Sequence, residues 1–293
     1  MTSELARLLE DEITLLRVAI TGAEPPAASL LHVLLSDAIA RRVRMRFLGT
    51  GVGRFSLTLA RTPAPQIMAR SLERFVKTAA AIDWFRCVLG LQPAEARVFQ
   101  ADARRLPDDL GEVDIVLTSP PYLPASSGRE SYARARALSL IALGITDPLE
   151  VDELVDESIG SMQGNGALFG DLTAEERQLV DWLQRDSLRA IKAEPTARYF
   201  LEMRQAFGEM VRVLRPGGLA VVVSGKSSTF YNFSTREVLY VARSAELLAE
   251  EAARAGFQVQ ALHDLQLQKA NKNARPRSLD DYYETLIFLQ KPG

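Results

Sequence analysis

The chain has 293 residues, of which 47% are apolar and 25% are charged, a composition that indicates a globular protein with a substantial core. Its formal net charge of −2 excludes a uniformly basic surface, so contacts with nucleic acid must come from local clusters of cations. No apolar run approaches the roughly 18 residues that span a bilayer, and the opening residues lack a secretory signal, so we expect a cytoplasmic protein with no membrane partner.

The beginning of the chain is predicted to be helical. Apolar residues recur at helical spacing over Ser3 to Ile20 and over Ala27 to Arg41, and Pro25-Pro26 separates the two stretches. This pattern predicts a helical hairpin. We therefore predict a helical segment at residues 1–42 and an α/β domain at residues 43–293.

Short apolar runs and helical stretches alternate along the rest of the chain. The strands are predicted at Ala96 to Ala101, Val113 to Thr118, Leu219 to Val223, Phe257 to Leu267 and Glu284 to Gln290, and the helices at Tyr199 to Leu214 and Ala245 to Ala255. Arg215-Pro216-Gly217-Gly218 is predicted to be the turn that ends the first of these helices. The alternation predicts an α/β layered fold with a mainly parallel sheet, an antiparallel terminal strand pair, and a helical insertion at about residues 144–197.

Cysteine and histidine are too scarce to favour a metal site. Cys87 is the only cysteine, and we expect it to be buried in the helical stretch Ala79 to Leu91. His32 and His263 are the only histidines, and positions on a helix face or in a strand account for them. We therefore expect no metal ligands and a chemistry that depends on other groups.

The tetrapeptide Ser119-Pro120-Pro121-Tyr122 directly follows the predicted strand Val113 to Thr118. Open α/β sheets bind ligands at the carboxyl ends of their strands, so a site is expected at this loop. An exocyclic base amine is a poor nucleophile until two acceptors align its lone pair, and the Ser119 hydroxyl and the Pro120 carbonyl can be those acceptors. The ring of Tyr122 can stack on a base that has been rotated out of the duplex. A simple turn is the alternative interpretation of these four residues.

Thr118-Ser119-Pro120-Pro121-Tyr122 resembles the catalytic motif of bacterial DNA amino-methyltransferases, which use S-adenosylmethionine (SAM), especially those that modify cytosine N4. The resemblance implies a Rossmann-like class I methyltransferase sheet, with Thr118 near the cofactor. It extends to Gln100-Ala101-Asp102-Ala103-Arg104, where Asp102, with Ala103, would contact the SAM adenine. A turn or helix-capping role is the alternative for Asp102. Glu157 to Ser161, the Leu214 to Gly218 stretch, and the Tyr283 to Leu289 strand also fit the family.

The resemblance also implies a glycine-rich turn after the first strand and an acid after the second strand. Gly49, Gly51 and Gly53 could form that turn, although Arg44 and Arg46 stand in the expected strand. Pro65 to Arg70 could be the second strand, but it ends in a cation. Two alternatives stay open: a divergent SAM turn at Gly49 to Gly53, or a SAM-binding part on a second methyltransferase subunit.

Local cations are the candidates for DNA contact. Arg129 follows the tetrapeptide, and a basic stretch contains Lys269, Lys272, Arg275 and Arg277. Solvated loops, or a structural ion pair for Arg129, are the alternatives. The sequence therefore predicts transfer of a methyl group from SAM to a DNA amine, with an RNA or protein methyltransferase and a non-catalytic DNA-binding subunit as the rivals.

Overall fold

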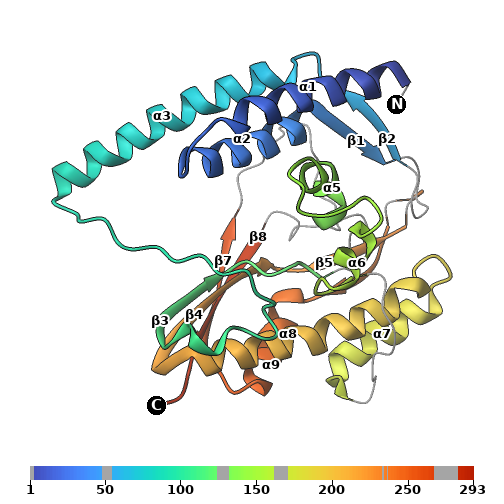
Figure 1. Ribbon diagram of the computed structural model, residues 1–293. Helices are drawn as coiled ribbons and strands as arrows, with labels where there is room; N and C mark the ends of the chain where they lie inside the picture. Colours follow the sequence, from blue (N-terminus) through green and yellow to red (C-terminus); the bar gives the residue numbers. More distant parts are fainter. Residues whose placement is uncertain are drawn as a thin grey trace. The chain divides into compact units, whose positions relative to one another are not determined.

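The computed structural model describes residues 3–47, 55–123, 132–161, 171–232, 234–235, 237–266 and 283–293. In these ranges the chain is a mixed α/β protein that divides into two compact units (Figure 1). Unit 1 comprises Met1–Arg97 and Tyr132–Leu154, and unit 2 comprises Val98–Ser131 and Val155–Gly293. The domain boundary after residue 42 stays a prediction.

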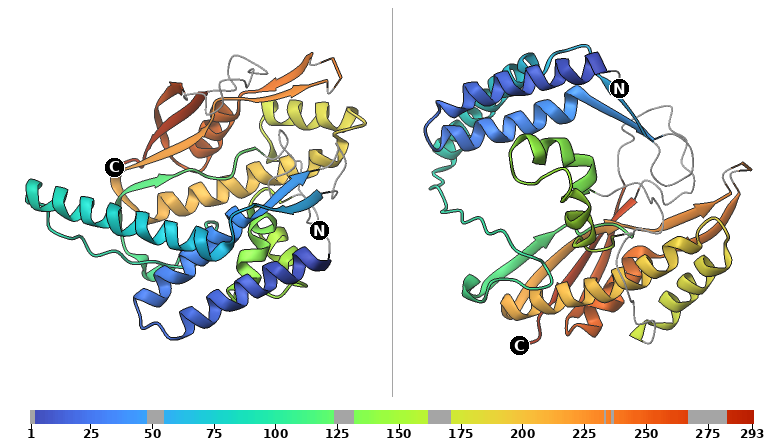
Figure 2. Two further views of the ribbon diagram at one scale, coloured as in Figure 1. Left: turned by 90° about the horizontal axis from the view of Figure 1, so that it is seen from above. Right: turned by 45° about the vertical axis from the view of Figure 1, so that its right-hand side comes forward.

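Unit 1 is a group of helices with one pair of strands. Its core includes Leu16, Leu35 and Ile67, which come from three helices that pack side by side (Figure 2). Arg42 and Glu12 form a buried ion pair, with 2.7 Å between Nη2 and Oε1, and this pair holds the end of the second helix against the first. The elements are α1 (Ser3–Thr21), α2 (Ala27–Arg42), β1 (Val43–Phe47), β2 (Phe55–Leu59), α3 (Ala64–Leu89) and α5 (Tyr132–Ala142). The predicted helical pair at the beginning of the chain is confirmed.

The strands of unit 1 differ from the predicted pattern. β1 pairs antiparallel with β2, so the next described element after β1 is a second strand and not a helix. Gly49 to Gly53, the predicted SAM turn, lie outside the described residues. The strand predicted at Pro65 to Arg70 is wrong, because these residues belong to α3 and bury Ile67 and Met68 at helical spacing.

Unit 2 contains the larger sheet, with the strand order β3-β4-β8-β7. β3 is parallel to β4, whereas β8 is antiparallel to both β4 and β7. The prediction of a mainly parallel sheet is therefore wrong for the described strands, and the antiparallel terminal pair is confirmed. The elements are η1 (Asp108–Leu110), β3 (Val113–Thr118), α7 (Ala174–Arg185), η3 (Ala190–Lys192), α8 (Ala193–Val213), β4 (Leu214–Gly225), β5 (Ser228–Tyr231), β6 (Val238–Ala242), α9 (Ser244–Arg254), β7 (Gln258–Gln266) and β8 (Tyr283–Gln290), with α6 (Val151–Asp156) across the boundary between the units.

Helices α8 and α9 cover one face of this sheet (Figure 1). Along β4, Ala220 and Val222 are completely buried in the core that these helices complete, and Leu219 on the opposite face is 41% exposed. Ile287 and Leu289 of β8 are completely buried in the same core. The period-2 alternation of these strands thus fixes which face carries the core.

Three local predictions are wrong. Ala96 to Ala101 forms no described strand, and Val98 is 96% exposed, so its side chain gains no stabilisation from burial in a sheet. Arg215 to Gly218 is part of β4 and not a separate turn: Gly217 has a φ of 73°, and the register with β3 shifts at this point. Cys87 is exposed on α3.

The described part of the predicted insertion at residues 144–197 contains the helices α6 and α7, with turns before and after them. Thr173 begins α7 with a capping box, since its hydroxyl accepts the N–H of Glu176 and the Glu176 carboxylate accepts the N–H of Thr173. The antiparallel pair of β5 and β6 was absent from the prediction.

Candidate functional site

The tetrapeptide lies at the carboxyl end of β3, as the sequence predicts. Ser119 is exposed, whereas Pro120 is buried and Leu123 is buried in the core of unit 2. Two buried side chains thus anchor the loop, and the hydroxyl of Ser119 remains accessible to a ligand. Thr118 is partly buried beside Val222, on the face of the sheet that α8 covers.

Tyr199 of α8 holds the loop from the covered face of the sheet. Its Oη donates a hydrogen bond to the carbonyl oxygen of Pro121 at 2.8 Å. The Tyr199 side chain is almost completely buried, and this burial raises the pKa of its phenol far above the ordinary value. The phenol therefore keeps its proton and remains a donor. Sequence reasoning placed Tyr199 in a helix but carried no signal of this contact.

Tyr122 is held from the other side. Its Oη donates a hydrogen bond of 2.7 Å to Oε1 of Glu284 in β8, and 40% of the tyrosine remains exposed. The ring passes Gly225 at the end of β4, the residue that pairs in register with Glu284. Neither Glu284 nor Gly225 was among the predicted site residues.

Asp102, the predicted adenine contact, is bound to Arg104. The guanidinium donates to both carboxylate oxygens, with a shortest distance of 2.7 Å from Nη2 to Oδ2. These hydrogen bonds hold the pKa of the Asp102 carboxyl below its usual value, so the group stays ionised at neutral pH. The Asp102 side chain is 47% exposed, and the neighbouring Ala103 is exposed. The carboxylate is thus ionised and accessible, and it is also part of a local turn.

Helix α8 brings together three segments that the resemblance singled out. Glu202 accepts hydrogen bonds from Arg104 Nη1 at 2.7 Å and from the Gly160 N–H at 2.9 Å. Arg198 donates to the Ser161 carbonyl and lies 3.8 Å from Glu202, and Tyr199 contacts Pro121 as described. The Asp102 turn, the tetrapeptide and the Glu157 to Ser161 stretch therefore share one helix as their support.

The other predicted site residues lie outside the described ranges. They are Gly49, Gly51 and Gly53 of the predicted SAM turn and Arg129, Lys269, Lys272, Arg275 and Arg277 of the predicted DNA contacts. Their roles stay predictions.

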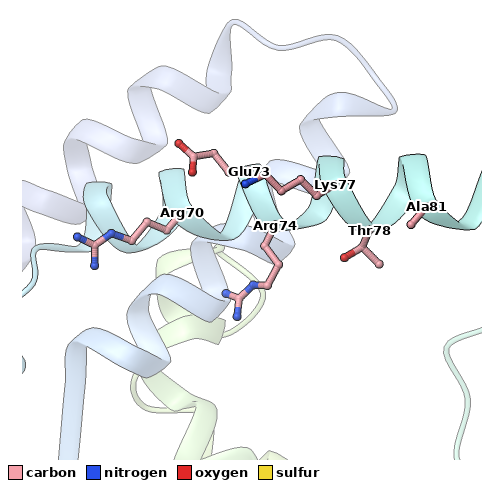
Figure 3. A pocket seen from close by; sticks show the side chains of 6 residues that line it. All are labelled: Arg70, Glu73, Arg74, Lys77, Thr78 and Ala81. Atoms are coloured by element: carbon pink, nitrogen blue, oxygen red, sulfur yellow. The ribbon is translucent and has the colours of Figure 1, made fainter.

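A hollow of about 450 Å³ lies along α3 in unit 1 (Figure 3). Its lining carries three cations and one acid, all from a single helix: Arg70, Glu73, Arg74, Lys77, Thr78 and Ala81. Residues of the tetrapeptide do not line it. Among the described residues, no cluster of histidine, cysteine and carboxylate side chains could hold a metal, and no helix is long and apolar enough to cross a membrane.

Comparison with known proteins gives partial similarities to methyltransferase structures. A candidate DNA modification methylase from Thermus thermophilus, complexed with S-adenosyl-L-methionine, is 19% identical over 34% of this chain and 40% of that chain, with a TM-score of 0.28. Another structure of that methylase is 17% identical over 66% of this chain and 52% of that chain, with a TM-score of 0.33. A SAM-dependent methyltransferase from Methanosarcina mazei is 16% identical over 32% of this chain and 52% of that chain, with a TM-score of 0.21.

The chain thus spans between 40% and 52% of the length of these three structures. No protein-family model matches the chain, and no curated protein matches it. Activity, substrate and partners are therefore inferred from the residues of the site.

Proposed function

We propose that this chain transfers a methyl group from SAM to an exocyclic amine of a DNA base, with cytosine N4 as the favoured acceptor. One observation supports the proposal above all. Ser119-Pro120-Pro121-Tyr122 lies at the carboxyl end of a strand, its Ser119 is exposed, and buried Tyr199 and the Glu284 carboxylate hold the loop from two sides.

Methyl transfer to an exocyclic amine requires alignment of the amine more than it requires a general base. The lone pair of an aromatic amine is delocalised into the ring, and two acceptors for its N–H groups turn that lone pair toward the methyl donor. Ser119 Oγ and the Pro120 carbonyl are the two acceptors, and the Tyr122 ring supports the flipped base by stacking. The methylated ammonium loses its proton readily to solvent, so the reaction needs no side chain with a strongly shifted pKa.

SAM supplies the electrophilic methyl group. The described residues could form only part of a binding site for SAM. The ionised, accessible carboxylate of Asp102, next to Ala103, fits a hydrogen bond with the adenine amine. Gly49, Gly51 and Gly53 are the candidates of this chain for the methionine end, and they lie outside the described residues. The cofactor site is therefore complete only with these glycines or with another polypeptide.

The edge of the larger sheet favours a second subunit. β3 is an outer strand of the described sheet, and β1 and β2 pair with each other in unit 1 instead of extending it. A strand added parallel to β3 would bring its carboxyl end next to Ser119, where a SAM turn is needed. We propose that a second methyltransferase subunit supplies such a strand. SAM binding by the chain alone would instead favour the Gly49 to Gly53 turn of this chain.

The decisive experiment measures methylated bases. The full chain, alone and with the product of any adjacent reading frame, is expressed in a host that lacks amino methylation of DNA, and the DNA nucleosides are analysed by mass spectrometry. We expect N4-methylcytosine with the wild type, and a loss of about 100-fold or more with Ser119→Ala, whose fold should be intact by circular dichroism. Detection of N6-methyladenine instead of N4-methylcytosine would identify adenine as the acceptor base. Wild-type levels in Ser119→Ala would overturn the assigned role of the hydroxyl.

The rivals give other results. Methylated RNA or protein without methylated DNA would indicate a different substrate class, and the same samples serve for these measurements. Calorimetry with SAM tests the non-catalytic alternative: a chain that binds DNA but no SAM, with or without its partner, would be a regulatory subunit.

A further inference from the structure

The Tyr122 side chain crosses the end of β4 and contacts β8, the strand on the other side of β4. It follows β3, which pairs with β4, yet its hydroxyl binds Glu284 of β8 on the far side of β4. The residue of β4 between them is Gly225, the register partner of Glu284. A Cβ atom at Gly225 would lie 3.9 Å from both Cδ2 and Cε2 of the Tyr122 ring. The ring therefore passes beside Gly225 at an ordinary contact distance from a Cβ atom, and a side chain larger than alanine there would need the space that the ring occupies.

Glu284 is itself held on both sides. Tyr283 lies under the Lys226 ammonium, with 5.4 Å from Nζ to the ring centroid. Thr285 Oγ1 donates to Asp264 Oδ1 at 2.7 Å, and the same aspartate forms an ion pair with Lys226 at 2.8 Å. Glu284 thus projects from a segment of β8 that its neighbours fix, which suits a carboxylate that has to hold another side chain in place.

We propose that Glu284 is a positioning residue for the methyl transfer and acts through the Tyr122 hydroxyl. The hydrogen bond of 2.7 Å from the Tyr122 hydroxyl to the Glu284 side chain fixes the rotation of the ring about its bonds. The ring edge at the hydroxyl is then bound and one side lies at Gly225, so the exposed part of the ring is presented in a single orientation. This inference rests on the proposed function, because the oriented face is the one on which the target base stacks.

The ordering matters because Tyr122 is partly exposed in a loop after an edge strand. A tyrosine in such a position would otherwise populate several rotamers, and each base that stacks would bear the cost of ordering it. Removal of the carboxylate is therefore expected to weaken productive use of DNA and to leave the affinity for SAM unchanged.

A double-mutant cycle tests this route. With DNA from an unmethylated host and labelled SAM, Glu284→Ala should lower kcat/KM for DNA about tenfold, and KM for SAM should stay constant. Tyr122→Phe should cause a similar loss, because it removes the same hydrogen bond. Adding Glu284→Ala to Tyr122→Phe should then change the rate less than about twofold. Losses that multiply in the double variant would overturn the proposal, because Glu284 would then act by another route.

Two further variants separate positioning from a structural role. Glu284→Gln keeps an oxygen acceptor and should retain the rate within about threefold of the wild type. Gln290→Ala is the matched control: it lies on the same strand and face, and its side chain also forms hydrogen bonds, but at the end of β8 away from Tyr122. A loss in Gln290→Ala equal to that in Glu284→Ala would indicate a general effect of damaging β8 and contradict the proposal.

A measurement without turnover keeps this inference separate from the proposed function. In protein labelled with 3-fluorotyrosine, the Tyr122 signal is identified by its loss in Tyr122→Phe. We expect Glu284→Ala to shift this fluorine resonance and Gln290→Ala to leave it unchanged. An unchanged resonance in Glu284→Ala would show that the carboxylate does not position the ring, even in a protein that methylates DNA. If the resonance shifts but no DNA is methylated, the contact stands and the proposed function fails.

Discussion

The central and outer strands of the larger sheet differ in burial, and the candidate site belongs to an outer strand. In β4 and β8, alternate residues such as Val222 and Ile287 are completely buried under α8 and α9. In β3, the core-facing residues Val116 and Thr118 are only partly buried, and Ile115 and Leu117 on the opposite face are 61% and 74% exposed. Even on the face that α8 covers, β3 is therefore buried less than its neighbour β4.

This difference shows how the loop after β3 is held. An exposed strand contributes little packing to the loop that follows it. The contacts that position Pro121 and Tyr122 come instead from the buried elements, as hydrogen bonds from Tyr199 and to Glu284. Substitutions in the buried elements should therefore affect stability, and substitutions at these two contacts should affect the site.

The largest expected effect tests the buried side of the comparison. Phe207 of α8 is completely buried and packs against Phe257 with 6.5 Å between ring centroids. Phe207→Ala should lower the free energy of unfolding by about 3–5 kcal/mol, because it leaves a cavity in the core. Leu117→Ala in β3 should change it by less than about 0.5 kcal/mol. Urea unfolding followed by circular dichroism measures both, and equal losses would contradict the distinction between the strands.

A buried carboxyl group on α7 provides the next test. Glu176 is completely buried, and one of its carboxylate oxygens accepts the Thr173 N–H at 2.8 Å. Burial, with a further contribution from the charge of Glu251, raises the pKa of Glu176 to about 8. A glutamate in the unfolded chain titrates near 4.5. Between these values the folded state binds a proton that the unfolded state releases, so stability falls as pH rises.

We therefore expect the melting temperature to fall between pH 6 and pH 8. Glu176→Gln should reduce this dependence and stabilise the protein at pH 8 by on the order of 1–3 kcal/mol. Differential scanning calorimetry at several pH values measures the effect. Glu250→Gln, an exposed carboxylate on α9, is the control and should keep the wild-type dependence. Equal slopes in the wild type and Glu176→Gln would mean that Glu176 is ionised in the folded state at pH 6.

Tyr199→Phe tests the first of the two contacts that hold the loop. The variant keeps the ring in the core and removes the donor to the Pro121 carbonyl, so we expect a loss of about 1 kcal/mol in the free energy of unfolding. Methyl transfer should fall further, by about tenfold, because the loop loses its alignment. Tyr240→Phe is the control, since that ring stacks on Trp182 instead. A stability loss without any change in methylation would make the contact purely structural.

The sequence predicted the parts of this site that depend on neighbouring residues. The apolar run of β3 and the tetrapeptide after it are contiguous, and the predicted strand has the bounds observed, Val113–Thr118. The strand predicted at Ala96 to Ala101 is wrong, because a local apolar pattern does not show whether a neighbouring strand is available to pair with it. The prediction of a mainly parallel sheet was wrong because the order and direction of strands depend on contacts between distant segments, which a local sequence pattern does not contain.

The contacts that hold the loop could not be predicted for the same reason. Tyr199 and Pro121 are 78 residues apart, and Tyr122 and Glu284 are 162 residues apart. A helical pattern places Tyr199 on a buried face but does not indicate which carbonyl its hydroxyl will meet. Gly225 gave no signal either, because a glycine near the end of a strand is common and its role appears only when a ring from the adjacent strand crosses it.

The smallest expected effect concerns this glycine, which belongs to the buried strand but faces the exposed ring of Tyr122. Gly225→Ala adds a Cβ atom at an ordinary contact distance of 3.9 Å from the ring, and alanine suits an extended strand at least as well as glycine. We expect a change in unfolding free energy within about 0.5 kcal/mol and unchanged methylation. Gly225→Leu needs the space that the ring occupies, so it should lower methylation while the melting temperature changes little. If Gly225→Leu is as active as Gly225→Ala, the path of the ring across β4 is not needed for the reaction.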